Sequence, residues 1–191
     1  MKKIQIVLVF LLIVGCSGKE KVKKDYVMHE IDFLNRTLPV PKNYQRITFD
    51  EYQTIIKESY DDPAFIEGFV NGVENLKQMF DSYALFCDQD DIRNTLTIFR
   101  MDNPKPNDYF GRVVSKQIHA QMKRAGELEG YVYKPLNNRL INGWLFKIKG
   151  ERHYKEQDMY MYQTTYMAHK FGAYAVHMDK EMDFEEEFTQ R

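Results

Sequence analysis

The segment Asp158–Ala168, with the sequence DMYMYQTTYMA, decides the fold class of this chain. Its side chains alternate between two sets, as they do on the two faces of a β-strand. One set is Tyr160, Tyr162, Thr164 and Tyr166, and the other is Met159, Met161, Gln163, Thr165 and Met167. Aromatic and β-branched residues are also enriched in strands. The segment is therefore predicted to be a strand.

Further strands are predicted on both sides of this segment. Leu140–Lys149, LINGWLFKIK, is predicted to be one strand because its apolar side chains also alternate. His169–Gly172 has the length of a hairpin turn, after which Ala173–Met178 returns along the strand before it. The sequence thus predicts an antiparallel sheet centred on Leu140–Met178.

The remaining chain predicts helices and a few more strands. Thr48 and Glu51 have the spacing of a capping box, and Asp62 has the position of a helix cap before a proline. Gly68 and Gly72 lie four residues apart in an apolar stripe, which indicates a close packing contact. The predicted helices are Phe49–Tyr60, Pro63–Phe80, a third helix that Asp108 caps and that runs to about Ala125 with Gly126 as its stop, and Glu181–Gln190. The predicted strands are Tyr26–Leu34, Ser82–Cys87, Asn94–Met101 and Tyr131–Lys134, with a proline-rich turn at Leu38–Tyr44.

The N-terminal segment Ile4–Cys16, IQIVLVFLLIVGC, follows two lysines and is almost entirely apolar. At about 1.5 Å per residue, a helix of about 11 residues covers only part of a hydrocarbon core of about 30 Å. Its proportions are those of the apolar region of a signal peptide. The alternatives are an ordinary signal peptide with an incidental cysteine, or a buried apolar strand.

The end of this segment, Ile13–Cys16, closely resembles the lipobox of bacterial lipoproteins. The resemblance implies cleavage after Gly15 and lipidation of Cys16, with acyl chains such as palmitate on the new N-terminus. Two or three acyl chains hold a protein on a membrane almost permanently, because each buried methylene contributes about 0.8 kcal/mol. The expected organisation is a signal peptide at 1–15, a lipidated cysteine and polar tether at 16–25, and one α/β domain at 26–191.

Composition excludes some classes of function. The chain holds 27 Lys and Arg against 28 Asp and Glu, and removal of residues 1–15 takes two lysines. The mature chain is then slightly acidic, so nucleic acid is not an expected partner. Aromatic residues reach 14%, which argues against disorder. Cys87 lies in an apolar run and is predicted to be a small buried side chain, with a reactive thiol as the alternative.

The order of these elements, together with Leu38–Tyr44, Tyr162–Tyr166 and Asp183–Phe188, resembles the PsbP-like family. That family includes the extrinsic photosystem II subunit PsbP and the DcrB-like periplasmic lipoproteins. The resemblance implies an α+β fold in which helices flank an antiparallel sheet on both faces, an α/β/α sandwich. It also implies non-catalytic accessory or partner-binding roles, and it provides no catalytic residues.

Motifs that carry chemistry are missing from the sequence. It contains no phosphate-binding loop, nucleophile elbow, HExxH or CxxC pattern. His169 and His177 are too far apart along a hairpin to share a metal ion. The acidic pairs Asp61–Asp62 and Asp90–Asp91 are adjacent in turns, where surface charge is the simpler role. No catalytic residue, metal ligand or cofactor is therefore predicted, and the chain is not expected to be an enzyme.

The tyrosine row Tyr160, Tyr162 and Tyr166 is the candidate partner-binding site, since tyrosine is enriched at interfaces. The alternative is that a helix covers these rings. The sequence thus predicts a lipoprotein of the bacterial cell envelope, anchored to the membrane and facing the periplasm. Its expected role is that of an accessory or ligand-binding module for an envelope partner. The alternative is an envelope hydrolase with an unrecognised active site.

Replacement of Cys16 by serine should release the protein from membranes, because serine cannot take the thioether-linked lipid. Membrane fractionation measures this release, and inhibition of the lipoprotein signal peptidase should leave a heavier precursor. An unchanged membrane fraction for Cys16→Ser would contradict the lipid anchor.

Overall fold

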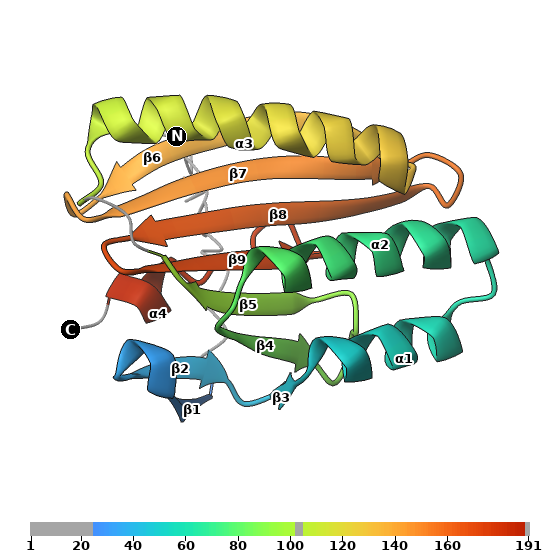
Figure 1. The fold of residues 1–191 in the computed structure, drawn as a ribbon, viewed down its shortest axis with the longest axis horizontal. Helices are drawn as coiled ribbons and strands as arrows, with labels where there is room; N and C mark the ends of the chain where they lie inside the picture. The colour runs from blue at the N-terminus through green and yellow to red at the C-terminus, as the bar shows by residue number, and fades with distance from the viewer. Residues whose placement is uncertain (1–24, 102–104, 190–191) are drawn as a thin grey trace, which may run out of the picture.

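The computed structural model describes residues 25–101 and 105–189, and within them seven strands form one antiparallel sheet (Figure 1). These strands are β3 (Tyr44–Ile47), β4 (Tyr83–Asp88), β5 (Thr95–Arg100), β6 (Val132–Ile141), β7 (Leu145–Tyr154), β8 (Met159–Ala168) and β9 (Phe171–His177). Their order is β3-β4-β5-β9-β8-β7-β6, with β9 in the middle. The predicted antiparallel sheet and the α+β class are confirmed.

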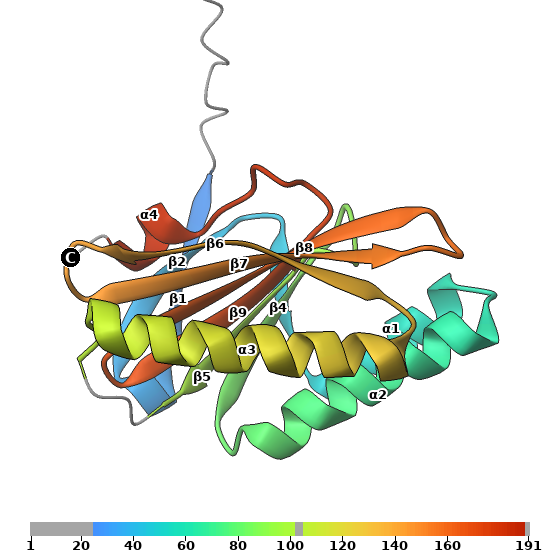
Figure 2. The same cartoon turned by 90° about the horizontal axis from the view of Figure 1, so that it is seen from above.

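Three long helices cover one face of the sheet (Figure 2). They are α1 (Phe49–Ser59), α2 (Pro63–Met79) and α3 (Asp108–Glu129). A hairpin of β1 (Tyr26–Ile31) and β2 (Arg36–Pro41) packs on the opposite face with the short helix α4 (Glu185–Thr189). A 3-10 turn, Asp32–Leu34, joins the two strands of the hairpin. In β8, Tyr166 packs in the core with the hairpin, whereas Met159 and Met161, from the other set, pack in the core with α2.

The predicted starts of α1 and α2 are confirmed. The Thr48 hydroxyl accepts a hydrogen bond from the backbone N–H of Glu51 at 3.1 Å, and the Glu51 carboxylate accepts one from the N–H of Thr48. Asp62 accepts from the N–H groups of Ala64 and Phe65 at 3.0 and 3.2 Å. These side chains pair backbone donors that a helix leaves without intrahelical partners.

Helix α3 differs from its prediction at both ends. Its cap is Asn107, whose side chain accepts from the N–H of Phe110 at 2.9 Å. It ends at Glu129, where Gly130 adopts a left-handed φ of 76°. The predicted stop, Gly126, lies inside the helix, and a Cβ there would come within 2.4 Å of the Tyr131 carbonyl oxygen. Gly126 therefore permits a close approach of the chain and does not end the helix.

Leu140–Lys149 is not one strand, which corrects the sequence prediction. Asn142 and Gly143 form a turn between β6 and β7, with φ values of 49° and 69°. The loop has three residues, since Ile141 pairs with Leu145, and Asn and Gly at its first two positions tolerate positive φ. The predicted turn at Leu38–Tyr44 is also wrong in part, since residues 36–41 form β2 and pair with β1. Both strands of a two-stranded sheet are edges, where prolines are tolerated.

Two other boundaries also move. The predicted last helix, Glu181–Gln190, shortens to Glu185–Thr189 in the described residues. The strand Tyr131–Lys134 extends to Ile141 as β6, with an irregular register between Pro135 and Asn138. Terminal residues of short elements depend on tertiary contacts that sequence patterns do not carry.

Helix α3 lies close to the sheet because small residues face it. Gly111 and Ser115 are buried in this helix. A Cβ on Gly111 would come within 2.0 Å of the Phe146 ring of β7, which is itself buried. The spacing between α3 and β7 thus depends on the missing side chain of Gly111.

Gly111→Ala should lower the free energy of unfolding by about 1–3 kcal/mol, because the buried Phe146 ring must shift. Gly72→Ala is the control, since its added Cβ would meet only the end of the Glu129 side chain, at 3.1 Å. Helix propensity favours that second change by about 1 kcal/mol. Denaturant titration of both variants measures the difference, and equal effects would contradict this packing argument.

Candidate functional site

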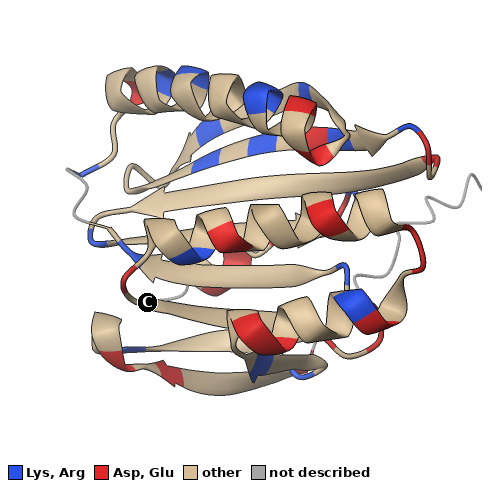
Figure 3. Ribbon diagram, turned by 45° about the vertical axis from the view of Figure 1, so that its right-hand side comes forward, with Lys and Arg blue, Asp and Glu red and all other residues tan. Residues whose placement is uncertain are grey.

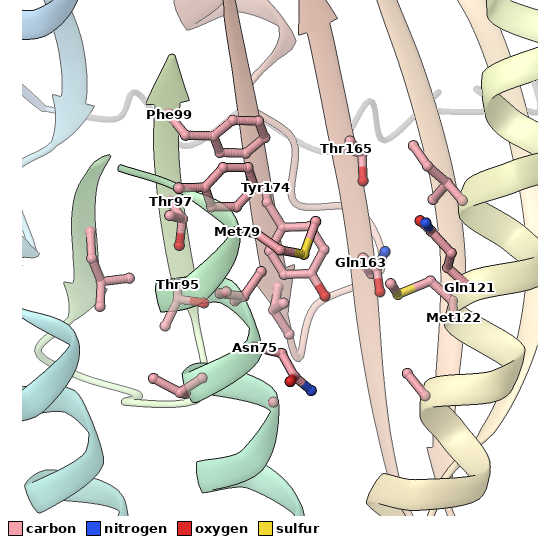
Figure 4. A pocket seen from close by; sticks show the side chains of 18 of the residues that line it. Asn75, Met79, Thr95, Thr97, Phe99, Gln121, Met122, Gln163, Thr165 and Tyr174 are labelled. Atoms are coloured by element: carbon pink, nitrogen blue, oxygen red, sulfur yellow. The ribbon is translucent and has the colours of Figure 1, made fainter. Parts of the chain in front are cut away.

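A cleft of about 740 Å³ lies between α2 and α3, over the sheet (Figure 4). Its walls and floor are mainly apolar and come from all three long helices and from strands β4, β5, β7, β8 and β9. Among them are Val73, Leu76 and Met79 of α2, Ile118, Met122 and Ala125 of α3, Phe99 of β5, Met167 of β8, and Tyr174 and Val176 of β9. Small-molecule sites usually have volumes of about 300–1,000 Å³ and apolar linings with few polar groups. The cleft has the size and lining of such a site.

The cleft narrows where α2 and α3 approach each other. A Cβ on Gly68 would lie 3.1 Å from the Glu129 carbonyl oxygen, and a Cβ on Gly72 would lie 3.1 Å from its carboxylate. The predicted close contact at these two glycines is therefore confirmed, and its partner is the C-terminal end of α3. Toward Met79 and Val114, the two helices separate (Figure 1). The cleft is thus closed at the Glu129 end.

Arg152 of β7 lies at this closed end and is only 8% exposed. Its Nε and Nη2 donate hydrogen bonds to the Gln163 side-chain oxygen at 3.0 and 2.9 Å. Nη2 also donates to the Tyr174 hydroxyl. The guanidinium carbon lies 4.6 Å from the centre of the Tyr131 ring, a cation–π distance. These neighbours are neutral, so they orient the guanidinium and leave its charge in place.

Glu129 is the acidic neighbour of Arg152, and the two side chains are not tightly paired. The distance from Arg152 Nη1 to Glu129 Oε2 is 3.6 Å, whereas charge-assisted hydrogen bonds measure about 2.7–2.9 Å. Burial raises the pKa of the Glu129 carboxyl, and the nearby Arg152 opposes this rise only in part. One Arg and one Glu would suggest a neutral site. Because the Glu129 carboxyl is loosely paired and takes up a proton more readily, the closed end of the cleft favours the binding of a negative group.

The charge of the cleft is concentrated at that end. Glu129 and Arg152 are the only charged side chains among the lining residues that the structure describes. β8 and β9 carry no charged residue at all (Figure 3). Uncharged polar groups lie along the floor and at the exposed rim, as Figure 4 shows in part. The floor has Thr95, Thr97, Gln163 and Thr165, and the rim has Asn75, Gln78, Gln117 and Gln121. Such a lining suits a molecule with an apolar body and one polar end.

The structure separates the tyrosines of the predicted row. Tyr166 is fully buried on the hairpin face, where its hydroxyl donates to Asp183 at 2.6 Å and accepts from the N–H of Phe184 at 2.8 Å. Tyr160 is 41% exposed and stacks on His153 with ring centres 4.1 Å apart. Tyr160 and Tyr162 line a second hollow of about 420 Å³. Tyr166 therefore belongs to the scaffold, whereas a partner contact through the other two stays a prediction.

The other predicted features have the following positions. Cys16 lies outside the described residues. Cys87 is buried as predicted, and burial raises the pKa of its thiol to about 12. Among the residues that the structure describes, no group of three His, Cys, Asp or Glu side chains could hold a metal ion. In the same residues, no helix is long and apolar enough to cross a membrane.

Sequence reasoning missed the polar residues of the cleft. Gln163 stands in the methionine set of β8, so a polar residue at a core-facing position was the available signal. In the same way, Arg152 stands in β7 at one of the alternate positions whose side chains are buried. Buried polar side chains normally have partners, and two such positions on adjacent strands point to each other. Glu129 gave no comparable signal, because acidic residues are common near helix ends.

Comparison with known proteins adds no relative. The chain matches no protein-family model and no curated protein sequence.

Tyr166→Phe should lower the free energy of unfolding by about 1–3 kcal/mol, because it removes a buried hydroxyl that both donates and accepts. Tyr160→Phe is the matched control and should change stability by less than about 0.5 kcal/mol, since its ring is partly exposed. Thermal melting of the two variants measures this. A neutral Tyr166→Phe would contradict the scaffold role of Tyr166.

Proposed function

We propose that this chain is a membrane-anchored envelope lipoprotein facing the periplasm, and that its α+β part is a non-catalytic ligand-binding module. The cleft between α2 and α3 is the proposed binding site. The observation that carries the proposal is a cavity of about 740 Å³ with a mainly apolar lining, whose charged side chains among the described residues are one Arg and one Glu. An accessible apolar cavity of this size favours the capture of a small molecule that has an apolar body.

The position of the proposed anchor relative to the cleft supports this function. The tether would join the described chain at Tyr26 of β1, and β1 packs on the sheet face opposite the long helices (Figure 2). The cleft lies on the helix face. A protein held through Cys16 would therefore keep its cleft away from its own attachment point. Anchoring would also raise the local concentration of any partner in the same membrane.

We further propose that the fold is an α/β/α sandwich of the PsbP-like type, modified on one face. The element order supports it, as does the packing of Phe184 and Phe188 against the sheet. In this proposal the β1–β2 hairpin shares with α4 the layer that helices would otherwise form. The resemblance to accessory proteins agrees with a binding role.

A photoreactive probe tests the binding site directly. The full chain in phospholipid nanodiscs would be irradiated with a long-chain alcohol that carries a diazirine, and labelled peptides would be identified by mass spectrometry. Labelling is expected on peptides of α2, α3 and β8 that line the cleft. Ala125→Phe, which places a ring in the cleft, should reduce this labelling severalfold.

Ala120→Phe is the matched control, because Ala120 is an exposed alanine of the same helix outside the cleft. It should leave the labelling unchanged. Equal labelling of both variants, or labelling confined to peptides far from α2 and α3, would contradict the proposed site.

A further inference from the structure

The two most buried cations of the sheet have very different ion pairs. Lys147 of β7 is 3% exposed and contacts two carboxylates, those of Asp183 at 2.7 Å and of Glu185 at a still shorter distance. Arg152 on the same strand is 8% exposed and has one acidic neighbour, Glu129, at 3.6 Å. Lys147 lies under the C-terminal segment, whereas Arg152 lines the open cleft. The loosely paired cation is therefore the one that a ligand can reach.

We propose that the cleft binds an amphipathic acid, an elongated apolar molecule whose terminal carboxylate is received by Arg152. The inference rests on the proposed function and names the ligand class of the same site. The apolar walls hold the body of the molecule, and the closed end holds its charged group. Arginine suits this task because its planar guanidinium matches the geometry of a carboxylate.

Neighbouring groups complete the carboxylate site. Gln163 and Tyr174 hold the guanidinium from the floor, so its orientation exists before the ligand arrives. The Tyr131 hydroxyl is buried and has no hydrogen-bond partner among the described residues. Its ring centre lies 4.6 Å from the guanidinium carbon of Arg152, so the ring supports the cation from outside the cleft lining. Such pre-formed polar groups lower the cost of ordering a bound ligand.

Glu129 fits a role as the internal competitor of the ligand. Its carboxylate lies over Gly72 at the narrow end, close to Arg152 without a hydrogen bond between them. Because burial raises the pKa of this carboxyl, Glu129 takes up a proton more readily than an exposed glutamate. A neutral Glu129 would leave Arg152 to the ligand, and it would also offer an O–H donor to the incoming carboxylate.

A single cation also favours a carboxylate over a phosphate. Glu129 adds negative charge beside the site, and Arg152 is the only positive side chain of the described lining. A phosphate group carries more charge and would need further donors. A carboxylate with one negative charge balances one guanidinium.

Competition against the diazirine alcohol tests this assignment in the full chain. Octanoate should displace the probe at about tenfold lower concentration than octanol, which is about 1.4 kcal/mol, because its carboxylate makes a charge-assisted hydrogen bond with Arg152. Octyl phosphate should displace it less well than octanoate. Arg152→Met should abolish the advantage of octanoate, and Arg124→Met, an exposed arginine of α3 outside the cleft, should retain it.

A second variant keeps the test decisive if Arg152→Met does not fold. Glu129→Gln keeps the shape of the side chain and removes the competing charge, so it should strengthen octanoate severalfold and leave octanol unchanged. Equal competition by octanoate and octanol in the unmodified chain would overturn the inference, as would an octanoate preference that Glu129→Gln does not alter. Stronger competition by octyl phosphate would overturn the carboxylate. In all three cases, cleft labelling by the alcohol would leave the proposed function standing, whereas its absence would contradict that function itself.

Discussion

Burial of both faces of the central strands is the constraint on which this structure depends. β8 and β9 lie inside the sheet and have cover on each side, so almost every side chain from Gln163 to Ala168 is removed from water. Any polar group there needs a partner inside the protein. The neighbouring strand β7 carries two buried cations on opposite faces. Arg152 donates to Gln163 of β8, and Lys147 contacts Asp183, which also accepts from Tyr166 of β8.

The charges of the two buried cations are compensated in different ways. On the hairpin face, burial alone would raise the pKa of Asp183, yet hydrogen bonds from Lys147 and Tyr166 lower it to about 2. The carboxylate thus stays charged, and its contacts with Lys147 and Tyr166 fix the C-terminal segment on the sheet. On the helix face, Arg152 has mainly neutral hydrogen-bond partners. Lys147 therefore belongs to a structural ion pair, whereas Arg152 keeps a positive charge that is only partly compensated.

How much of this could be read from the sequence depends on the range of the interactions involved. Capping at Thr48 and Asp62 is local chemistry, and the sequence analysis placed both helix starts correctly. The Asn142–Gly143 turn was also a local signal, but the apolar alternation around it suggested a continuous strand. Alternation says which residues share a face and not where a chain reverses. The error therefore came from weighting periodicity above turn chemistry.

The cleft could not be predicted in the same way, because it depends on the angle between two helices. Gly68, Gly72 and Gly126 let the C-terminal half of α3 approach α2 and Tyr131 closely. Sequence spacing indicated a contact at the first two glycines, but it did not identify Glu129 as the partner. The tyrosine set of β8 was predicted to be the binding site because its members are large and repeated. Its methionine set, with the single Gln163, borders the cavity and gave a weaker signal.

The loose pairing of Arg152 and Glu129 is hard to explain as a device for stability. A buried ion pair repays the cost of desolvation only when its geometry is good, and a distance of 3.6 Å without a hydrogen bond gives little return. Two apolar side chains would pack the closed end with less free-energy cost. Local conflicts of this kind are concentrated at functional sites in natural proteins. The arrangement becomes reasonable if a third charged group, carried by a ligand with an apolar body, completes it from the open side of the cleft.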